Sequence, residues 1–144
     1  MSQVYQTSSS VSEDYHLELF NLINEFRQQA GLPSFEWSIP LAEAAQAHAE
    51  DMAQNNYFDH AGLDASSPAD RAQRAGYSSS FVGENIAAGN EIPKAVFEQW
   101  MNSSGHRDNM LNEKYTEVGI GTILHAPQTK DSHYWVLKLG NPNV

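Results

Sequence analysis

The apolar residues change their spacing along the chain, and this change limits the folds that the sequence can adopt. Up to about residue 102 they recur every three or four positions, as on one face of a helix, whereas the last third carries runs that alternate, as in strands. Helices followed by strands, without a repeating strand–helix–strand order, predict an α+β domain.

The helix boundaries follow from residues that commonly begin or end helices. The first helix is expected to begin between Ser12 and Asp14, and Ser67 followed by a proline is typical of another helix start. The first helix is expected to stop at Gly31, and a second to cover residues 40–55. A short third helix is expected between the cap Ser67 and the terminator Gly76, and a fourth over residues 93–102.

Two segments near the C-terminus are expected to pair as strands. TEVGIGTIL (residues 116–124) and HYWVLKLG (residues 133–140) flank a polar stretch and so predict a hairpin. Because glycines weaken a strand, we interpret Gly119 and Gly121 as sites where a helix approaches closely. The segment GYSSSFVGENIAAGN (residues 76–90) is predicted to be a loop.

The length and charge of the chain exclude several classes of function. Its 144 residues suggest one domain over residues 13–144, preceded by a polar, flexible tail over residues 1–12. A net charge of −10 argues against nucleic acid and anionic membrane surfaces. No apolar run reaches the ~20 residues of a transmembrane helix. The N-terminus lacks the pattern of a signal peptide, so we expect none in this chain.

Three side chains stand out as candidates for a shared site. His60 and His106 are each expected in a loop just after a helix, preceded by a local turn signal, and Glu84 lies between them in the motif GENIA. Two imidazoles and a carboxylate can bind a divalent metal such as zinc, or form a pH-sensitive hydrogen-bonded cluster without metal. The spacing of the three does not match a helical ligand pattern such as HExxH.

The remaining polar candidates are interpreted as structural. His48 lies on the apolar stripe of the second helix, which favours a hydrogen-bonded core residue. His16, His125 and His133 are expected in surface or capping roles. A serine nucleophile beside His106 is not favoured, because the chain has no GxSxG motif.

Five motifs occur in an order that is typical of one family. YFDH, GENIA, WMNSSGHRDNML, VGIG and YWVLKLG follow one another between about residues 57 and 140. The chain resembles the CAP superfamily, also called the SCP domain, in its compact bacterial form. This resemblance implies an α-β-α sandwich with an antiparallel sheet between two helical layers, and secretion from the cell.

The resemblance also implies a central cleft that contains two histidines and two acids. By motif, the histidines are His60 and His106 and the first acid is Glu84. The position of the second acid, three residues after Trp100, is occupied by Ser103. The chain therefore retains three of the four cleft residues.

Three functional hypotheses follow. The leading one is a secreted, monomeric, non-enzymatic protein that binds zinc through His60 and His106, with Glu84 as a further candidate ligand, and recognises a lipid, a glycan or a protein. The alternative is a zinc-dependent hydrolase of the peptidase type, in which Glu84 activates a metal-bound water. The third is a purely structural role for the cleft residues.

Overall fold

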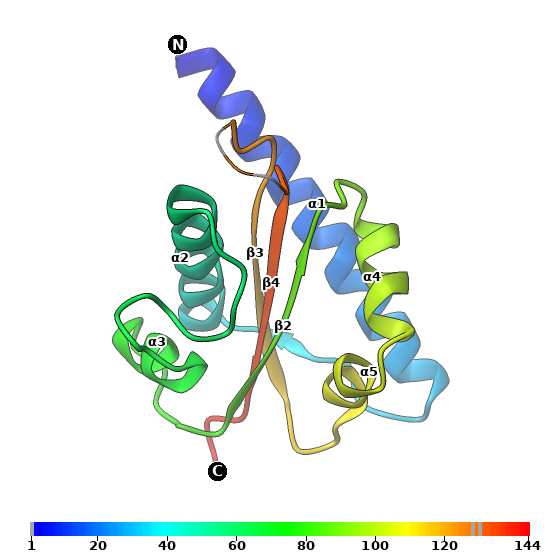
Figure 1. Ribbon diagram of the computed structural model, residues 1–144. Coiled ribbons are helices and arrows are strands. Elements are labelled where there is room, and N and C mark those ends of the chain that lie inside the picture. The colour runs from blue at the N-terminus through cyan, green and yellow to red at the C-terminus, as the bar shows by residue number, and fades with distance from the viewer. Residues whose placement is uncertain (1, 128, 130) are drawn as a thin grey trace.

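A computed structural model describes residues 2–127, 129 and 131–144, and its helices and strands form three layers (Figure 1). A central sheet lies between α2 and α3 on one face and α1, α4 and α5 on the other. This arrangement confirms the predicted α+β class and the α-β-α sandwich. The elements are α1 (Ser2–Gln29), β1 (Glu36–Trp37), α2 (Ile39–Asn55), α3 (Pro68–Arg74), β2 (Val82–Ala88), α4 (Pro93–Met101), α5 (Ser104–Leu111), β3 (Glu117–Ile123) and β4 (Tyr134–Gly140).

Within the described residues the sheet has four strands in the order β1-β3-β4-β2. The predicted hairpin is confirmed, because β3 pairs antiparallel with β4. On its other side β4 pairs antiparallel with β2, and the two-residue β1 adds a parallel edge to β3. The strand β2 therefore lies at the edge of the sheet, where side chains from both helical layers can reach it.

Two glycines of β3 allow α2 to lie almost directly on the sheet. A Cβ atom at Gly119 would come within 2.0 Å of the backbone nitrogen of Ala42, and one at Gly121 within 2.3 Å of that of Gln46. The side-chain amide of Gln46 also forms two hydrogen bonds with the backbone of Thr122. It accepts from the Thr122 nitrogen at 3.0 Å and donates to the Thr122 oxygen at 3.1 Å. The expectation that a helix approaches closely at these glycines is confirmed.

Each face of the sheet carries its own apolar core. On the α2 face, small and apolar side chains pack on Ile86 and Val136. On the opposite face, the fully buried Trp100 and Trp135 pack against residues of α1 and the sheet. The indole of Trp100 also donates to the backbone oxygen of Ile86 at 3.0 Å, which fixes α4 to β2.

The segment predicted as a loop over residues 76–90 contains β2, and that prediction is wrong. All seven residues of β2 pair with β4, and Glu84 to Ala87 are buried. The sequence VGENIAA does not alternate and is poor in β-branched residues, so its local pattern gives little strand signal. Pairing with β4 and coverage by helices determine its conformation instead.

Two helices also differ from their expected extent. The first helix begins at Ser2 rather than near Ser12, since no glycine or proline interrupts this segment. The residues around His106 form α5 rather than a loop. The flexible tail over residues 1–12 and the single domain over residues 13–144 stay predictions. Of the helices in the described part of the chain, none has the length and apolarity needed to cross a bilayer.

We predict that Gly121→Ala destabilises the fold, because the added methyl group would overlap the backbone of α2, which cannot rotate away. Overpacking of this kind costs about 1–3 kcal/mol, and sometimes more. Chemical denaturation followed by circular dichroism measures the loss.

The matched control is Gly105→Ala in α5, where an added Cβ meets no atom of another described element within 4 Å. Replacing this glycine of the first helical turn by alanine should leave the stability unchanged or raise it by up to about 1 kcal/mol. Equal effects of the two substitutions would contradict the close approach of α2 to β3.

Candidate functional site

Glu84 lies in the middle of β2 and points toward the layer formed by α2 and α3. Its side chain is 1% exposed. Successive residues of a strand point to opposite faces, so the neighbouring Asn85 points toward α5. Two adjacent residues of the edge strand thus point toward the two helical layers.

Two buried cations hold the carboxylate of Glu84. The guanidinium of Arg71, on α3, donates to Glu84 Oε2 at 3.0 Å, and the ammonium of Lys138 lies 3.1 Å from the same oxygen. Lys138 is the cross-strand partner of Glu84 on β4 and is fully buried. Both cations also donate to backbone oxygens, Arg71 to Ser66 at 2.9 Å and Lys138 to Pro68 at 2.6 Å.

The charges in this cluster keep Glu84 ionised. Burial alone would raise its pKa, but the His60 hydrogen bond and the charges of Lys138 and Arg71 together lower the pKa to about 2. For Lys138 burial is the stronger influence, and it lowers the pKa to about 8 although Glu84 favours the charged form. At neutral pH, the carboxylate of Glu84 and the ammonium of Lys138 are therefore both charged.

His60 lies in the loop after α2, as predicted, and is in contact with Glu84. Its Nδ1 is 2.9 Å from Glu84 Oε1, and its backbone oxygen accepts from Arg71 at 2.6 Å. The side chain is 49% exposed. The carboxylate thus fixes one side of the ring, and the Nε2 side remains for solvent or a ligand.

His106 is the third residue of α5 and reaches the same edge of the sheet from the opposite layer. Asn85, which is fully buried, donates to the backbone oxygen of His106 at 3.0 Å and accepts from Asn109 at 2.9 Å. Burial lowers the pKa of His106, and the charge of the nearby His60 lowers it further. Its Nδ1 is buried without a hydrogen-bond partner in the described part of the chain.

The predicted site residues are therefore brought together only in part. His60 and Glu84 are in contact, and His106 is close enough for electrostatic coupling to His60. Among the described residues, the three do not form a group whose ligand atoms all lie within 4.8 Å of one another. Ser103 occupies the N-cap position of α5, and no side-chain capping bond is present there.

His48 has the role that its place on the α2 stripe predicts. It is fully buried, and its Nε2 is 2.8 Å from the backbone oxygen of Asp59. This contact holds the chain just before His60. His48 Nε2 also lies 3.9 Å from Glu84 Oε1, too far for a hydrogen bond.

Neither of the two cations that hold Glu84 was predicted from the sequence. A lysine within the apolar run YWVLKLG was a signal, because a buried lysine requires a partner. Arg71 had no comparable signal, since arginines on short helices are usually exposed. A second group, formed by Glu91, His125 and His133, was also missed. It joins the two histidines that flank the hairpin loop, and antiparallel pairing brings such positions together.

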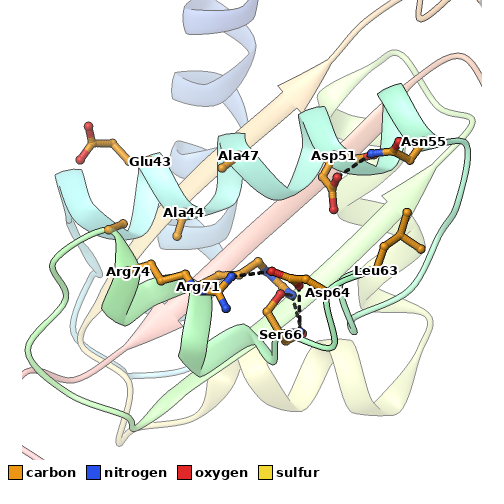
Figure 2. A pocket seen from close by; sticks show the side chains of 11 residues that line it. Glu43, Ala44, Ala47, Asp51, Asn55, Leu63, Asp64, Ser66, Arg71 and Arg74 are labelled. Carbon is orange, nitrogen blue, oxygen red and sulfur yellow. Dashed lines mark hydrogen bonds and ion pairs between the residues drawn. The ribbon is translucent and has the colours of Figure 1, made fainter.

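A pocket lies beside the cluster, between α2 on one side and α3 with the segment that leads into it on the other (Figure 2). Its volume is about 730 Å³, within the usual range for small-molecule sites. Charged side chains surround it, and Arg71 forms part of its wall while also holding Glu84. The lining residues are Glu43, Ala44, Ala47, Asp51, Asn55, Leu63, Asp64, Ser66, Arg71, Arg74 and Ala75.

Known structures share this architecture. The chain is similar to an extracellular protein from Bacillus anthracis that contains an SCP domain, with 31% identity, a TM-score of 0.84, and coverage of 94% of this chain and 43% of that one. It also shares its fold with an outer surface protein from Borrelia burgdorferi, at 23% identity, a TM-score of 0.80, and coverage of 90% of this chain and 94% of that one.

Sequence comparison agrees with the structural likeness. The uncharacterized protein YkwD of Bacillus subtilis is 41% identical over 80% of this chain, and the uncharacterized membrane protein YlbC of the same organism is 40% identical over 72%. The matched regions span 44% and 30% of those relatives, less than half of their length. The profile of the cysteine-rich secretory protein family matches residues 20–139. The chain therefore belongs to this family, the CAP family.

Proposed function

We propose that the chain is an extracellular, non-enzymatic binding domain whose cleft holds a divalent metal between His60 and His106. Because the two ligand atoms are nitrogens, the metal is zinc. The observation that carries the proposal is the bond between His60 Nδ1 and Glu84. Histidines that bind metals usually donate their second ring nitrogen to a carboxylate, which fixes the tautomer and the ring orientation. This arrangement leaves His60 Nε2 as the ligand atom.

The donor set fits zinc without Glu84 as a direct ligand. Both oxygens of Glu84 are already engaged by Arg71 and His60, and Lys138 approaches one of them. Two imidazole nitrogens with water in the remaining positions form an open site. The burial and the neighbouring His60 that lower the pKa of His106 favour its neutral form, which is the form that binds metal.

The hydrolase alternative needs Glu84 to accept a proton from water. A carboxylate with a pKa of about 2 that is paired with two cations is a poor general base at neutral pH. The chain also has Ser103 where the family pattern places a second acid. These features favour binding over catalysis.

The pocket beside Arg71 indicates the class of the organic ligand. Its acids (Glu43, Asp51 and Asp64) and its two arginines offer many polar contacts, and Leu63 is its largest apolar side chain. Charged side chains beside the apolar surface of alanines and Leu63 suit a ligand that carries polar groups as well as apolar faces, such as a glycan or a protein segment. A lipid chain would cover these charges without pairing them, which costs free energy. We therefore propose a polar ligand there.

The extracellular assignment is supported by the similar proteins. One relative of solved structure is described as extracellular, and another of the same fold as an outer surface protein. A chain without cysteines is compatible with this location, since it has no thiols to oxidise.

We predict that His60→Ala weakens zinc binding at least about tenfold, because loss of an outer-shell partner alone costs about 10–100-fold. Titration calorimetry measures the affinity, and the ring-nitrogen signals of His60 and His106 in NMR spectra identify the site. Glu98→Gln, an exposed substitution on α4, is the control and should bind like the wild type. Zinc affinity that is unchanged in His60→Ala, together with His60 and His106 signals that zinc does not shift in the wild type, would contradict the metal assignment.

A second prediction separates binding from hydrolysis. Incubation of the zinc-loaded protein with a peptide library, analysed by mass spectrometry, should yield no chelator-sensitive cleavage, because Glu84 is held in its ion pairs. Cleavage that a chelator stops, and that is absent in His60→Ala, would instead establish the hydrolase.

A further inference from the structure

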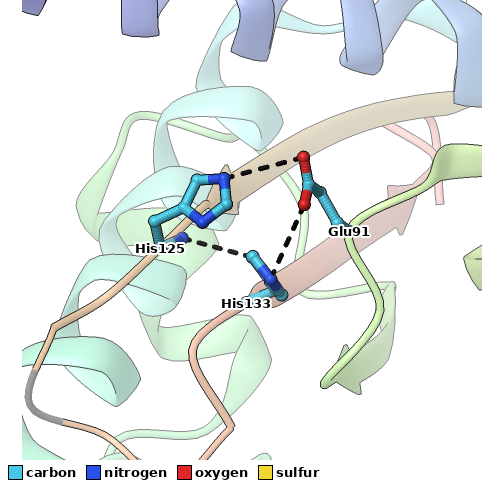
Figure 3. A group of neighbouring side chains, drawn as sticks. All are labelled: Glu91, His125 and His133. Carbon is cyan, nitrogen blue, oxygen red and sulfur yellow. Dashed lines mark hydrogen bonds and ion pairs between the residues drawn. The ribbon is translucent and has the colours of Figure 1, made fainter.

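We propose that Glu91, His125 and His133 form a second metal site, which takes zinc and joins the β3–β4 hairpin to the connection between β2 and α4 (Figure 3). Each residue offers a ligand atom, and these atoms all lie within 4.8 Å of one another. The site is separate from the cleft. Glu91 follows Ala88, the last residue of β2. Ala88 is already four residues along the strand from Glu84, which is about 13 Å at the rise of a strand.

The distances within the group suit a shared ion better than direct bonds. His125 Nε2 is 3.6 Å from Glu91 Oε2, and His133 Nε2 is 3.9 Å from Glu91 Oε1. Both distances exceed those of hydrogen bonds. In a tetrahedral zinc site with bonds of about 2.0–2.1 Å, the ligand atoms lie about 3.3 Å apart. The three side chains therefore converge on a point that a zinc ion would fill after small movements.

The backbone holds the three residues close together before any ion binds. Gly89 donates to the backbone oxygen of His133 at 2.9 Å, and the indole of Trp135 donates to that of Asn90 at 2.8 Å. Both bonds hold the residues before Glu91 against the start of β4. Across the hairpin, the amide of Ala126 donates to Ser132 at 2.7 Å, which places His125 beside His133. Sites supported in this way need little reorganisation to bind.

The donor set is that of a zinc site with one open position. Two imidazoles and one carboxylate are a known ligand set for zinc, with water as the fourth ligand. His125 is 69% exposed, so water and incoming ions reach the group. The net charge of −10 also favours the approach of cations.

One hydrogen bond must change when the ion binds. The backbone amide of His125 donates to His133 Nδ1 at 3.2 Å, which leaves the proton of a neutral ring on Nε2. Binding zinc through Nε2 requires that proton to move to Nδ1, and the amide then loses its acceptor. Because this hydrogen bond is exposed, water replaces the acceptor.

The ion would act as a cross-link in a chain that has no disulfides. Glu91 lies between β2 and α4, whereas the two histidines flank the turn of the hairpin. A ligand that binds only the folded chain stabilises it in proportion to the logarithm of its concentration. Saturating zinc should therefore raise the melting temperature by tightening this end of the sheet.

The test uses the full chain, zinc chloride as the probe, and NMR spectra that resolve the ring nitrogens of the six histidines. Zinc should shift the His125 and His133 signals, and a chelator should reverse the shift. In a His60→Ala background, which removes the cleft ligand, His125→Gln and Glu91→Gln should each weaken the remaining zinc binding at least about tenfold. The side chain of Glu91 is partly exposed and that of His125 is largely exposed, so we expect both variants to keep the fold.

Glu98→Gln is the matched control, since it removes the same charge from an exposed acid outside the group. Its zinc affinity and melting temperature should follow those of the parent protein. Unshifted His125 and His133 signals, or equal zinc affinity with and without Glu91→Gln, would overturn the second site. Loss of all zinc binding in His60→Ala would also overturn it, whereas no effect of His60→Ala would count against the cleft site alone.

Discussion

The buried carboxylate of Glu84 is the interaction on which the site and much of its surrounding structure depend. It connects β2 with β4 through Lys138, with α3 through Arg71, and with the loop after α2 through His60. Removing three charges from water costs several kcal/mol per ion, and the close contacts and additional backbone bonds of both cations offset that cost. Their donation to Ser66 and Pro68 also fixes the segment that leads into α3.

Because this cluster lies on an edge strand, the adjacent residues Glu84 and Asn85 contact helices in both layers. Glu84 faces α2 and α3, and Asn85 faces α5, where it holds the backbone of His106. The two histidines therefore approach the same edge from opposite sides of the sheet. Because Ser103 stands where the family pattern places an acid, His106 has no carboxylate partner among the described residues. The Nδ1 atom of His106 is buried and unpaired there. The two imidazoles are thus held differently, His60 by a side chain and His106 by its backbone.

The parts of the fold that local pattern determines were predictable. The stripe of α2, the proline and capping box of α3, and the β3–β4 hairpin are encoded by residues close in sequence. The strand β2 was not, because its pairing with β4 spans about fifty residues and its own sequence is rich in small residues. Motif resemblance identified His60, Glu84 and His106, but the ion pairs of Glu84 depend on cross-strand register and on the packing of α3, which no short pattern contains.

The central claim is that Glu84 is a structural anion coupled to Lys138 and Arg71. A double-mutant cycle with Glu84→Gln and Lys138→Met, followed by urea unfolding, tests it most directly. Breaking a buried pair costs about 3–5 kcal/mol, since one charge remains buried without its partner, whereas replacing both partners costs much less. We predict that each single substitution destabilises by roughly that amount and that the double substitution recovers part of the loss. Single substitutions that cost less than about 1 kcal/mol, or strictly additive effects, would contradict the account.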